Sequence, residues 1–511
     1  MLLVALGAFS SAITCGAATL SAAKLNPDGQ PKLSEGDADE RPALHERHVA
    51  PVNGMSARAA LGKAIFSDAT LSLHKNQSCG FCHTPETGFT SPREDFNGTG
   101  SVIEGSVPGL FGNNKPPSMA YMAFAPVLHH RIEDGETLIV GGAFWNGRAT
   151  GKQLGNAVAD QALAPFLNPV EMALPDAACV VRRVCKPEDP SAYPVKLTDL
   201  WGQEICAIAF PAGLDEQCTD PKAKIKLDEE ARDHVERAFA KIGLAVAAFE
   251  ASDEVNPYSS KYDMVLKGRA TFTDEEERGL ALYKGKGKCA NCHVLDAGPK
   301  GEPPLFTDFT YDNLGVPRNP DNPFYTQHEG INPHGHKWIE AGVGATLSKD
   351  PLYAALAQAN MGKVKVPTLR NVDKRPSPDF VKAFMHNGYF KSLKSVVHFY
   401  NTRDSKPRCP DPLTREADAM KAGCWPVPEV EANLNTDEMG DLKLTDAEEN
   451  AIVAFMKTLS DGYPPPQQSE CLEHRASYRD HSPGPYAFQT AAAQCNDGAD
   501  LLGDTVAWLI V

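Results

Sequence analysis

The pattern Cys-x-x-Cys-His occurs twice in this chain, at residues 79–83 and 289–293. In c-type haem attachment, two thiols at this spacing add to the vinyl groups on one porphyrin edge, and the adjacent histidine binds the iron. One copy could arise by chance or belong to a thioredoxin-like or zinc pair, but two copies predict two covalently bound haem c groups. The predicted attachment residues are Cys79, Cys82 and His83 for the first haem and Cys289, Cys292 and His293 for the second.

The charge and the N-terminus indicate an exported protein. A formal net charge of −16 argues against nucleic acid or anionic membranes as partners, because both need clustered positive charge. No run of about 18 apolar residues long enough to span a membrane is found. An apolar start followed by Ser21-Ala22-Ala23 predicts a signal peptide over residues 1–23, with a lipidated Cys15 as the alternative. We therefore expect a periplasmic location.

Eight of the 13 cysteines lie outside the haem motifs and the predicted signal peptide. They fall into neighbouring pairs, which favours disulfides in an oxidising compartment over reduced, buried thiols. The predicted pairs are Cys179–Cys185, Cys206–Cys218, Cys409–Cys424 and Cys471–Cys495.

The chain shows a weak internal repeat. Each unit has a helical pattern before its haem motif, at 57–66 and at 274–283 behind the N-cap Thr273, and each closes on an amphipathic helix, at 228–250 and 445–459. Strand signals are sparse, and there are 40 prolines and 41 glycines. The predicted fold is all-α and loop-rich, with two cytochrome c-like haem domains packed face to face.

Domain boundaries follow from the same patterns. The expected divisions are a flexible lead-in at 24–50, an N-terminal haem domain at 51–266, a C-terminal haem domain at 267–463 and a tail at 464–511. Two cysteine-bearing segments, 175–222 and 404–435, are expected to be inserted surface loops without chemistry of their own.

Several short motifs resemble those of the bacterial di-haem cytochrome c peroxidases, a family that includes the MauG-type enzymes. The first half carries Phe-Trp-Asn-Gly-Arg-Ala at 144–149, then Gln161-Ala162 and Pro165, then Asn-Pro-Val-Glu-Met at 168–172. The second half carries Leu-Arg-Asn-Val at 369–372 and His-Asn-Gly at 386–388. The resemblance covers about residues 55–175 and 225–460.

The resemblance implies that the first haem is a peroxide site with His83 as its proximal ligand. Glu171 matches the family's distal carboxylate, Gln161 and Pro165 line the same pocket, and Trp145 matches the tryptophan between the haems. A confined carboxylate can take a proton from bound peroxide and return it to the departing oxygen. On residue type alone, Glu171 could equally be a helix-terminal residue and Trp145 a core residue.

Two departures concern the distal ligands. Many di-haem peroxidases cap the resting first haem with a histidine from the following loop, but no histidine lies between Thr84 and Leu128, which predicts an open first haem. In the second half, the family's ligand position twelve residues after Gly388 is Tyr400, as in MauG-type members, and Met385 is the rival. An oxygen ligand would favour the ferric and higher oxidation states.

The family also holds a calcium ion between its haems, bound by an asparagine side chain and two backbone carbonyls. The carbonyl positions fall on Val381 and Ala383. Asn114 is one residue away from the expected asparagine position, which Lys115 occupies, and a lysine there would oppose the ion.

These observations predict a peroxidase that reduces hydrogen peroxide to water with electrons from a small cytochrome or copper protein. The alternative is a MauG-like enzyme that uses peroxide to oxidise side chains of a partner protein. A third reading is a non-enzymatic di-haem electron carrier, and Glu171 beside Gln161 counts against it.

Overall fold

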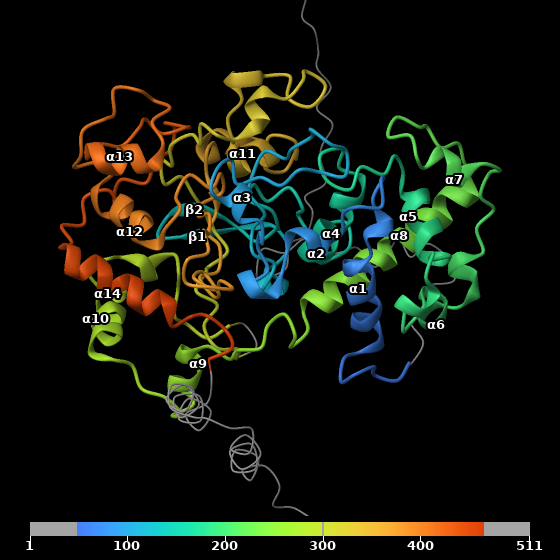
Figure 1. The fold of residues 1–511 in the computed structure, drawn as a ribbon, viewed down its shortest axis with the longest axis horizontal. Helices are drawn as coiled ribbons and strands as arrows, with labels where there is room; N and C mark the ends of the chain where they lie inside the picture. The colour runs from blue at the N-terminus through green and yellow to red at the C-terminus, as the bar shows by residue number, and fades with distance from the viewer. Residues whose placement is uncertain (1–48, 299–300, 464–511) are drawn as a thin grey trace, which may run out of the picture.

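The computed structural model describes residues 49–298 and 301–463. Two helical regions lie at opposite ends of the long axis, and a middle region consists mostly of loops (Figure 1). The first region contains α1 (Ala57–Ser67), α4 (Ala157–Leu167) and α8 (Glu229–Glu250). The second contains α10 (Asp274–Lys284), α12 (Leu393–Thr402) and α14 (Asp446–Lys457). Shorter helices are α2 (Cys79–Cys82), α3 (Glu94–Asn97), α9 (Lys261–Leu266) and α11 (Gly342–Leu347).

The four helices expected from the sequence are confirmed, and local caps explain where they begin. Thr273 caps α10 and Thr445 caps α14, and in each case the glutamate three residues later bonds back to the cap. Asp228 caps α8 by accepting a hydrogen bond from the backbone N–H of Ala231. These signals are local, so the sequence alone was enough to locate them.

Matching glycines let the helices of each half cross closely. A Cβ added at Gly62 of α1 would lie 1.9 Å from the Ala245 carbonyl oxygen of α8. A Cβ at Gly279 of α10 would lie 2.0 Å from the Ala451 carbonyl oxygen of α14. Only glycine allows backbones to approach this closely, so the same helix crossing is built twice. The helix-rich fold and the internal repeat agree with the sequence analysis.

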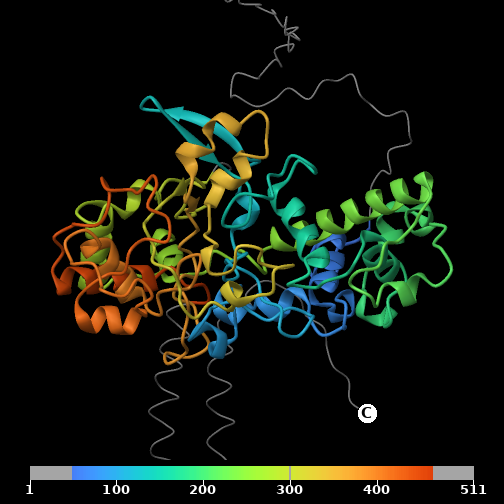
Figure 2. The same cartoon turned by 90° about the horizontal axis from the view of Figure 1, so that it is seen from above.

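A β-hairpin was not predicted. Strands β1 (His129–Glu133) and β2 (Glu136–Val140) pair antiparallel and project from the helical body (Figure 2). Asp134 and Gly135 at the turn both have positive φ, and this dipeptide is the sequence signal that could have revealed the hairpin. A second small sheet pairs β3 (Tyr311–Asp312) with β4 (Val364–Lys365). Within 49–298 and 301–463, no helix has the length and apolar character needed to cross a membrane.

Two of the predicted disulfide pairings are wrong. The bonds are Cys179–Cys218 and Cys185–Cys206, whereas Cys409–Cys424 is confirmed. Cys179 and Cys185 both lie on α5 (Ala177–Cys185), and six residues of helix separate their Cα atoms by about 9 Å, too far for a disulfide. The Cys471–Cys495 prediction lies outside the described residues.

Segment 175–222 is not a surface loop, which corrects the sequence-based expectation for that segment. Segment 175–222 forms α5, α6 (Leu197–Trp201) and α7 (Leu214–Gln217), and its side chains share one apolar core with α1 and α8. In segment 404–435, α13 (Glu416–Ala422) accompanies a fully buried Trp425. Apolar side chains inside these segments, rather than the cysteines alone, determine their packing.

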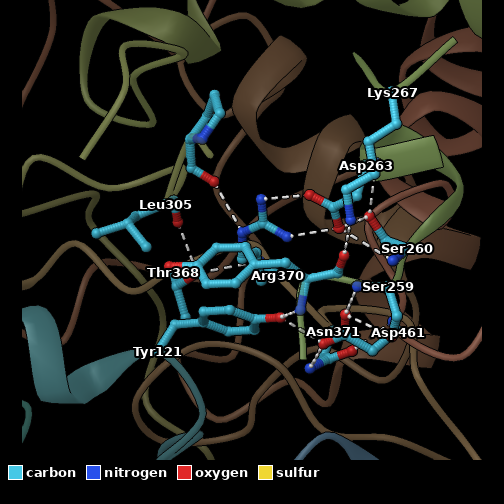
Figure 3. A network of polar contacts seen from close by, with 12 residues as sticks. Tyr121, Ser259, Ser260, Asp263, Lys267, Leu305, Thr368, Arg370, Asn371 and Asp461 are labelled. Atoms are coloured by element: carbon cyan, nitrogen blue, oxygen red, sulfur yellow. Dashed lines mark hydrogen bonds and ion pairs between the residues drawn. The ribbon is translucent and has the colours of Figure 1, made fainter. Parts of the chain in front are cut away.

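A buried polar network joins the first half to the second (Figure 3). Arg370 donates to both carboxylate oxygens of Asp263, each at 3.0 Å, and both side chains are inaccessible to solvent. The Tyr121 hydroxyl and the Asn371 amide each donate to Asp461 at 2.8 Å. Because Tyr121 belongs to the first half and Asp461 to the second, the network connects the regions that carry the two haem motifs.

Candidate functional site

The first cavity is lined by the first haem motif. Cys79 and Cys82 face it from α2, and His83 follows directly. The Nδ1 atom of His83 lies 2.9 Å from the Phe89 carbonyl oxygen. Because a carbonyl only accepts, Nδ1 carries the proton and Nε2 keeps its lone pair for an iron.

The second cavity repeats this arrangement. Cys289, Cys292 and His293 line it, and His293 Nδ1 lies 2.9 Å from the Phe306 carbonyl oxygen. Phe306 and its counterpart Phe89 both have a positive φ, of 54° and 56°. In both halves, therefore, the carbonyl of a phenylalanine with a positive φ orients the histidine.

The motif residues fit covalent haem. Among the described residues, the four motif cysteines are the free ones, and the other six are disulfide-bonded. Burial raises the pKa of Cys79 and of Cys289 to about 12. Two thioether bonds need two unpaired thiols, and an axial ligand needs a histidine with a free Nε2. Each cavity is lined by both.

Glu171 lines the first cavity together with Gln161 and Pro165. Backbone bonds hold its loop after α4, from Glu171 N to Asn168 O at 3.0 Å and from Met172 N to Pro165 O at 3.1 Å. Asn168 Nδ2 donates to Glu171 Oε1 at 2.9 Å. Burial raises the pKa of Glu171, while Arg148 and the Asn168 bond oppose the rise.

Arg148 also lines the first cavity, and sequence reasoning assigned it no role. Its guanidinium carbon lies 3.6 Å from the centre of the Phe144 ring, and its positive charge lowers the pKa of Glu171. Arg148 belongs to the motif at 144–149, so the signal was present. The direction of the Arg148 side chain could not be predicted from the sequence.

Trp145 lines both cavities, as do Lys365 and Pro367. Its indole Nε1 donates to the Lys115 carbonyl at 2.9 Å, and its own carbonyl accepts from Lys365 N at 2.8 Å. The His386 ring centre lies 6.4 Å from the indole ring centre. Trp145 therefore lies in the wall between the two cavities, and its place between two haems stays a prediction.

Segments 143–149 and 384–390 have matching backbones. Each is closed by an antiparallel bridge, Ala143 to Ala149 and Phe384 to Phe390. The φ angles are 65° at Phe144, 68° at Gly147, 65° at Met385 and 65° at Gly388. Met385 is thus the counterpart of Phe144, and His386 the counterpart of Trp145.

Helices α4 and α12 also match, and they differ at one informative position. The first cavity is lined by Val158, Gln161 and Pro165, and the second by Leu393, Val396 and Tyr400, at the same spacing. Pro165 offers no ligand atom to an iron, whereas the Tyr400 phenol does. Met385 lines the second cavity as well, and so do Met439 and Met456, which sequence reasoning did not consider.

The residues predicted to hold calcium face different partners. The Asn114 amide nitrogen donates to Glu340, and the Val381 carbonyl accepts from Asn97 Nδ2 at 3.1 Å. Ala383 is buried. Lys115 is buried beside Trp145, 8% exposed, at the position where the resemblance implies an asparagine.

Comparisons with known proteins place the chain in a family. The model of the di-haem cytochrome c peroxidases matches residues 56–271. The chain is 34% identical over 407 residues to the methylamine utilization protein MauG of Paracoccus denitrificans, covering 79% of this chain and 89% of that protein. It therefore belongs to the di-haem cytochrome c peroxidase and MauG family. Membership implies two haem c groups, in agreement with the two motifs, and an oxidoreductase that acts with peroxide.

Other relatives are named as peroxidases. The cytochrome-c peroxidase IdrP2 of Pseudomonas sp. (strain SCT) is 24% identical, over 80% of this chain and 82% of that protein. The crystal structure of the diheme peroxidase BthA from Burkholderia thailandensis matches with a TM-score of 0.58 and 29% identity. That match covers 81% of this chain and 87% of the other.

Proposed function

We propose that this chain is a periplasmic peroxidase that reduces hydrogen peroxide to water at the first haem site, using electrons from a small redox protein. The observation that carries the proposal is Glu171, a protonatable carboxyl that lines the first cavity together with Gln161 and Pro165. The haem, when bound, would supply an iron that binds peroxide and passes to it the electrons received from the donor.

Glu171 is the proton carrier in this proposal. Asn168 holds Oε1, which leaves Oε2 to take the proton from the inner peroxide oxygen and deliver it to the outer one. Burial raises the pKa of Glu171, which favours the protonated form needed for delivery, and Arg148 keeps the ionised form accessible. One peroxide, two protons and two electrons give two water molecules. Trp145, between the cavities, is the path for electrons that arrive through the second haem site.

A second candidate is a MauG-like reaction, in which the two electrons come from side chains of a partner protein. Tyr400 favours it, because an oxygen ligand at the second site stabilises oxidised iron. The 34% identity to MauG over most of both chains points the same way. The two candidates share the first site and differ only in the electron source.

Glu171→Gln tests the shared step. The amide keeps the shape but cannot carry the proton, so the rate of reaction with stoichiometric peroxide should fall about 10²- to 10⁴-fold. Stopped-flow absorbance measures this rate, and haem content and ferric spectra should be unchanged. Glu86→Gln, which changes an exposed carboxylate near the same haem motif, is the matched control. A Glu171→Gln protein that reacts at the wild-type rate would remove the proposal and favour the electron-carrier reading.

The electron source is tested separately. Wild-type protein is mixed with peroxide and a reduced small cytochrome or copper protein, and oxidation of the donor is followed by its absorbance. Catalytic turnover of the donor supports the peroxidase. Peroxide consumption without donor oxidation supports the MauG-like candidate.

A further inference from the structure

Lys365 is a buried lysine in the wall that the two cavities share. The residues that line both cavities are Trp145, Lys365 and Pro367, and none of the four motif cysteines is among them. Lys365 is only 4% exposed, although lysines are almost never fully buried unless their charge is paired. The ammonium group in this wall therefore needs a partner.

Backbone hydrogen bonds attach Lys365 to Trp145, and the other half of the chain repeats the arrangement. The Lys365 N–H donates to the Trp145 carbonyl at 2.8 Å. The Lys115 N–H donates at 2.9 Å to the carbonyl of His386, the counterpart of Trp145. The two lysines are therefore counterparts. They differ in position, because Lys115 lines the first cavity alone whereas Lys365 lines both.

The described part of the protein offers the Lys365 ammonium group little compensation. Its nitrogen donates to the Gly141 carbonyl at 2.6 Å and lies 4.2 Å from the centre of the Tyr311 ring. An ammonium group has three N–H donors, and the Tyr311 hydroxyl already donates to the same carbonyl. Within 49–298 and 301–463, no carboxylate forms an ion pair with Lys365. Burial lowers the pKa of Lys365 to about 7, and the charge of Asp308 opposes the change.

A haem brings the kind of partner that Lys365 lacks. Each haem carries two propionate carboxylates on the porphyrin edge opposite the vinyl groups. The motif cysteines hold the vinyl edge, so the propionate edge points away from them, and the shared wall contains none of these cysteines. An ammonium–carboxylate pair with charge-assisted hydrogen bonds leaves neither charge alone in a low-dielectric interior.

The other cations of the cavities do not occupy the same place. Lys115 and Arg148 line the first cavity but not the second. Lys288 lines the second cavity, but it directly precedes Cys289 and donates to the Asp437 carbonyl at 2.6 Å, so it lies at the vinyl edge. Lys365 is thus the lysine within reach of both haem sites.

We propose that Lys365 pairs with a haem propionate in the wall between the two haem sites. The ammonium group holds the propionate edge of that haem beside Trp145 and places a positive charge next to it. Lys365 is a positioning residue in this role, because it acts through the haem and not on peroxide. The inference depends on the two haem sites but not on the proposed peroxide reaction.

The wild-type holoprotein provides the first test. In a crystal structure with both haems attached, a propionate oxygen should lie within about 4 Å of Lys365 Nζ, the distance of an ion pair. The haem that carries this oxygen is the source of the carboxylate. A structure in which every propionate oxygen lies farther from Lys365 Nζ would overturn the proposal.

The charge is tested by Lys365→Met in spectroelectrochemical titrations that resolve the two haems. A nearby cation favours the ferrous state, which carries one positive charge less than the ferric state. Loss of the lysine should therefore shift the reduction potential of the paired haem downward, and that of the other haem by less. Lys63→Met, which removes an exposed lysine paired with Glu254, is the matched control and should leave both potentials unchanged.

Lys365→Gln separates the charge from the hydrogen bond. Glutamine can still donate to the Gly141 carbonyl but carries no charge, so the potential of the paired haem should shift as in Lys365→Met. Wild-type potentials in Lys365→Gln would show that the hydrogen bond matters and the charge does not, which contradicts the proposal. Wild-type potentials for both haems in Lys365→Met would contradict it as well. Because the crystal structure uses the wild type, a poorly folding variant does not remove the test.

Discussion

Pro165 and Tyr400 occupy matching positions on α4 and α12, and this is one of the chemical differences between the two cavities. A proline ring has no lone pair to offer an iron, which is consistent with the prediction of an open position at the first site. A phenol at the same place can fill the second site. Met385, the rival ligand, matches Phe144 in backbone conformation and so occupies a position that the other half uses for packing.

Replacing Tyr400 by Phe should therefore alter the second haem alone. Loss of the phenol oxygen removes a distal ligand, and the low-spin ferric signal in electron paramagnetic resonance should change while the first haem keeps its signal. Met385→Leu is the matched variant and should leave both signals in place. If Tyr400→Phe has no effect, the ligand is another donor of that cavity, and the candidates are Met385, Met439, Met456 and His386.

Motif order identified more of the candidate site than the local sequence around each residue did. The motif order located Glu171 and Trp145, which line the first cavity, and Tyr400, which lines the second; their roles there stay predictions. Lys365 was missed, although it lines both cavities, because nothing local marks a lysine whose ammonium will be buried against the Gly141 carbonyl at 2.6 Å. That environment exists only once distant segments have packed.

At the scale of elements, side-chain contacts with α14 hold α12, the helix that carries Tyr400, in place. Glu449 of α14 accepts hydrogen bonds from His398 Nδ1 (2.8 Å) and Asn401 Nδ2 (2.7 Å), and pairs with Lys394 at 2.9 Å. All three partners lie on α12. Burial alone would raise the pKa of Glu449, but these partners lower it to about 2.

Glu449→Gln should destabilise the protein in a pH-dependent way. The folded-state pKa of about 2 lies below the ordinary 4.5, so the carboxylate contributes its full stability above about pH 4.5 and loses it as the pH falls towards 2. At pH 7 the variant should lose about 1–3 kcal/mol of unfolding free energy in denaturant titrations. The difference in unfolding free energy between this variant and the wild type should become smaller as the pH falls. Glu431→Gln, which changes an exposed carboxylate, should not alter the unfolding free energy. A difference in unfolding free energy that does not depend on pH would contradict a stabilising role for the Glu449 charge.

Elements were predicted well where their signals were local. The capping residues Thr273 and Thr445 define helix starts within four residues of chain. The disulfides failed because pairing depends on how α5 packs, and the nearest cysteine in sequence, Cys185, lies on the same helix as Cys179. Sequence proximity is a poor guide once a helix separates the two side chains.

At the scale of the whole molecule, the two haem regions are tied together by the Arg370 network. Arg370 donates to Asp263 through two nitrogens and to the Pro304 carbonyl at 2.7 Å, and its guanidinium carbon lies 4.9 Å from the Tyr121 ring centre. Tyr121 in turn bonds to Asp461 near the end of the second region.

Asp263→Asn should cost about 3–5 kcal/mol of unfolding free energy, because it leaves the Arg370 guanidinium buried without its counter-charge. Replacing both partners, with Arg370→Met and Asp263→Leu together, should cost less than the single change, since no unpaired charge remains. Denaturant titration of the holoprotein measures both.

The exposed pair of Arg93 and Asp95, at 2.7 Å, is the control: Arg93→Met should cost no more than about 1 kcal/mol because solvent screens that pair. Equal losses from Asp263→Asn and Arg93→Met would show that the buried pair does not hold the halves together. A larger loss from the double variant than from Asp263→Asn would show that the network stabilises through its hydrogen bonds rather than through charge balance.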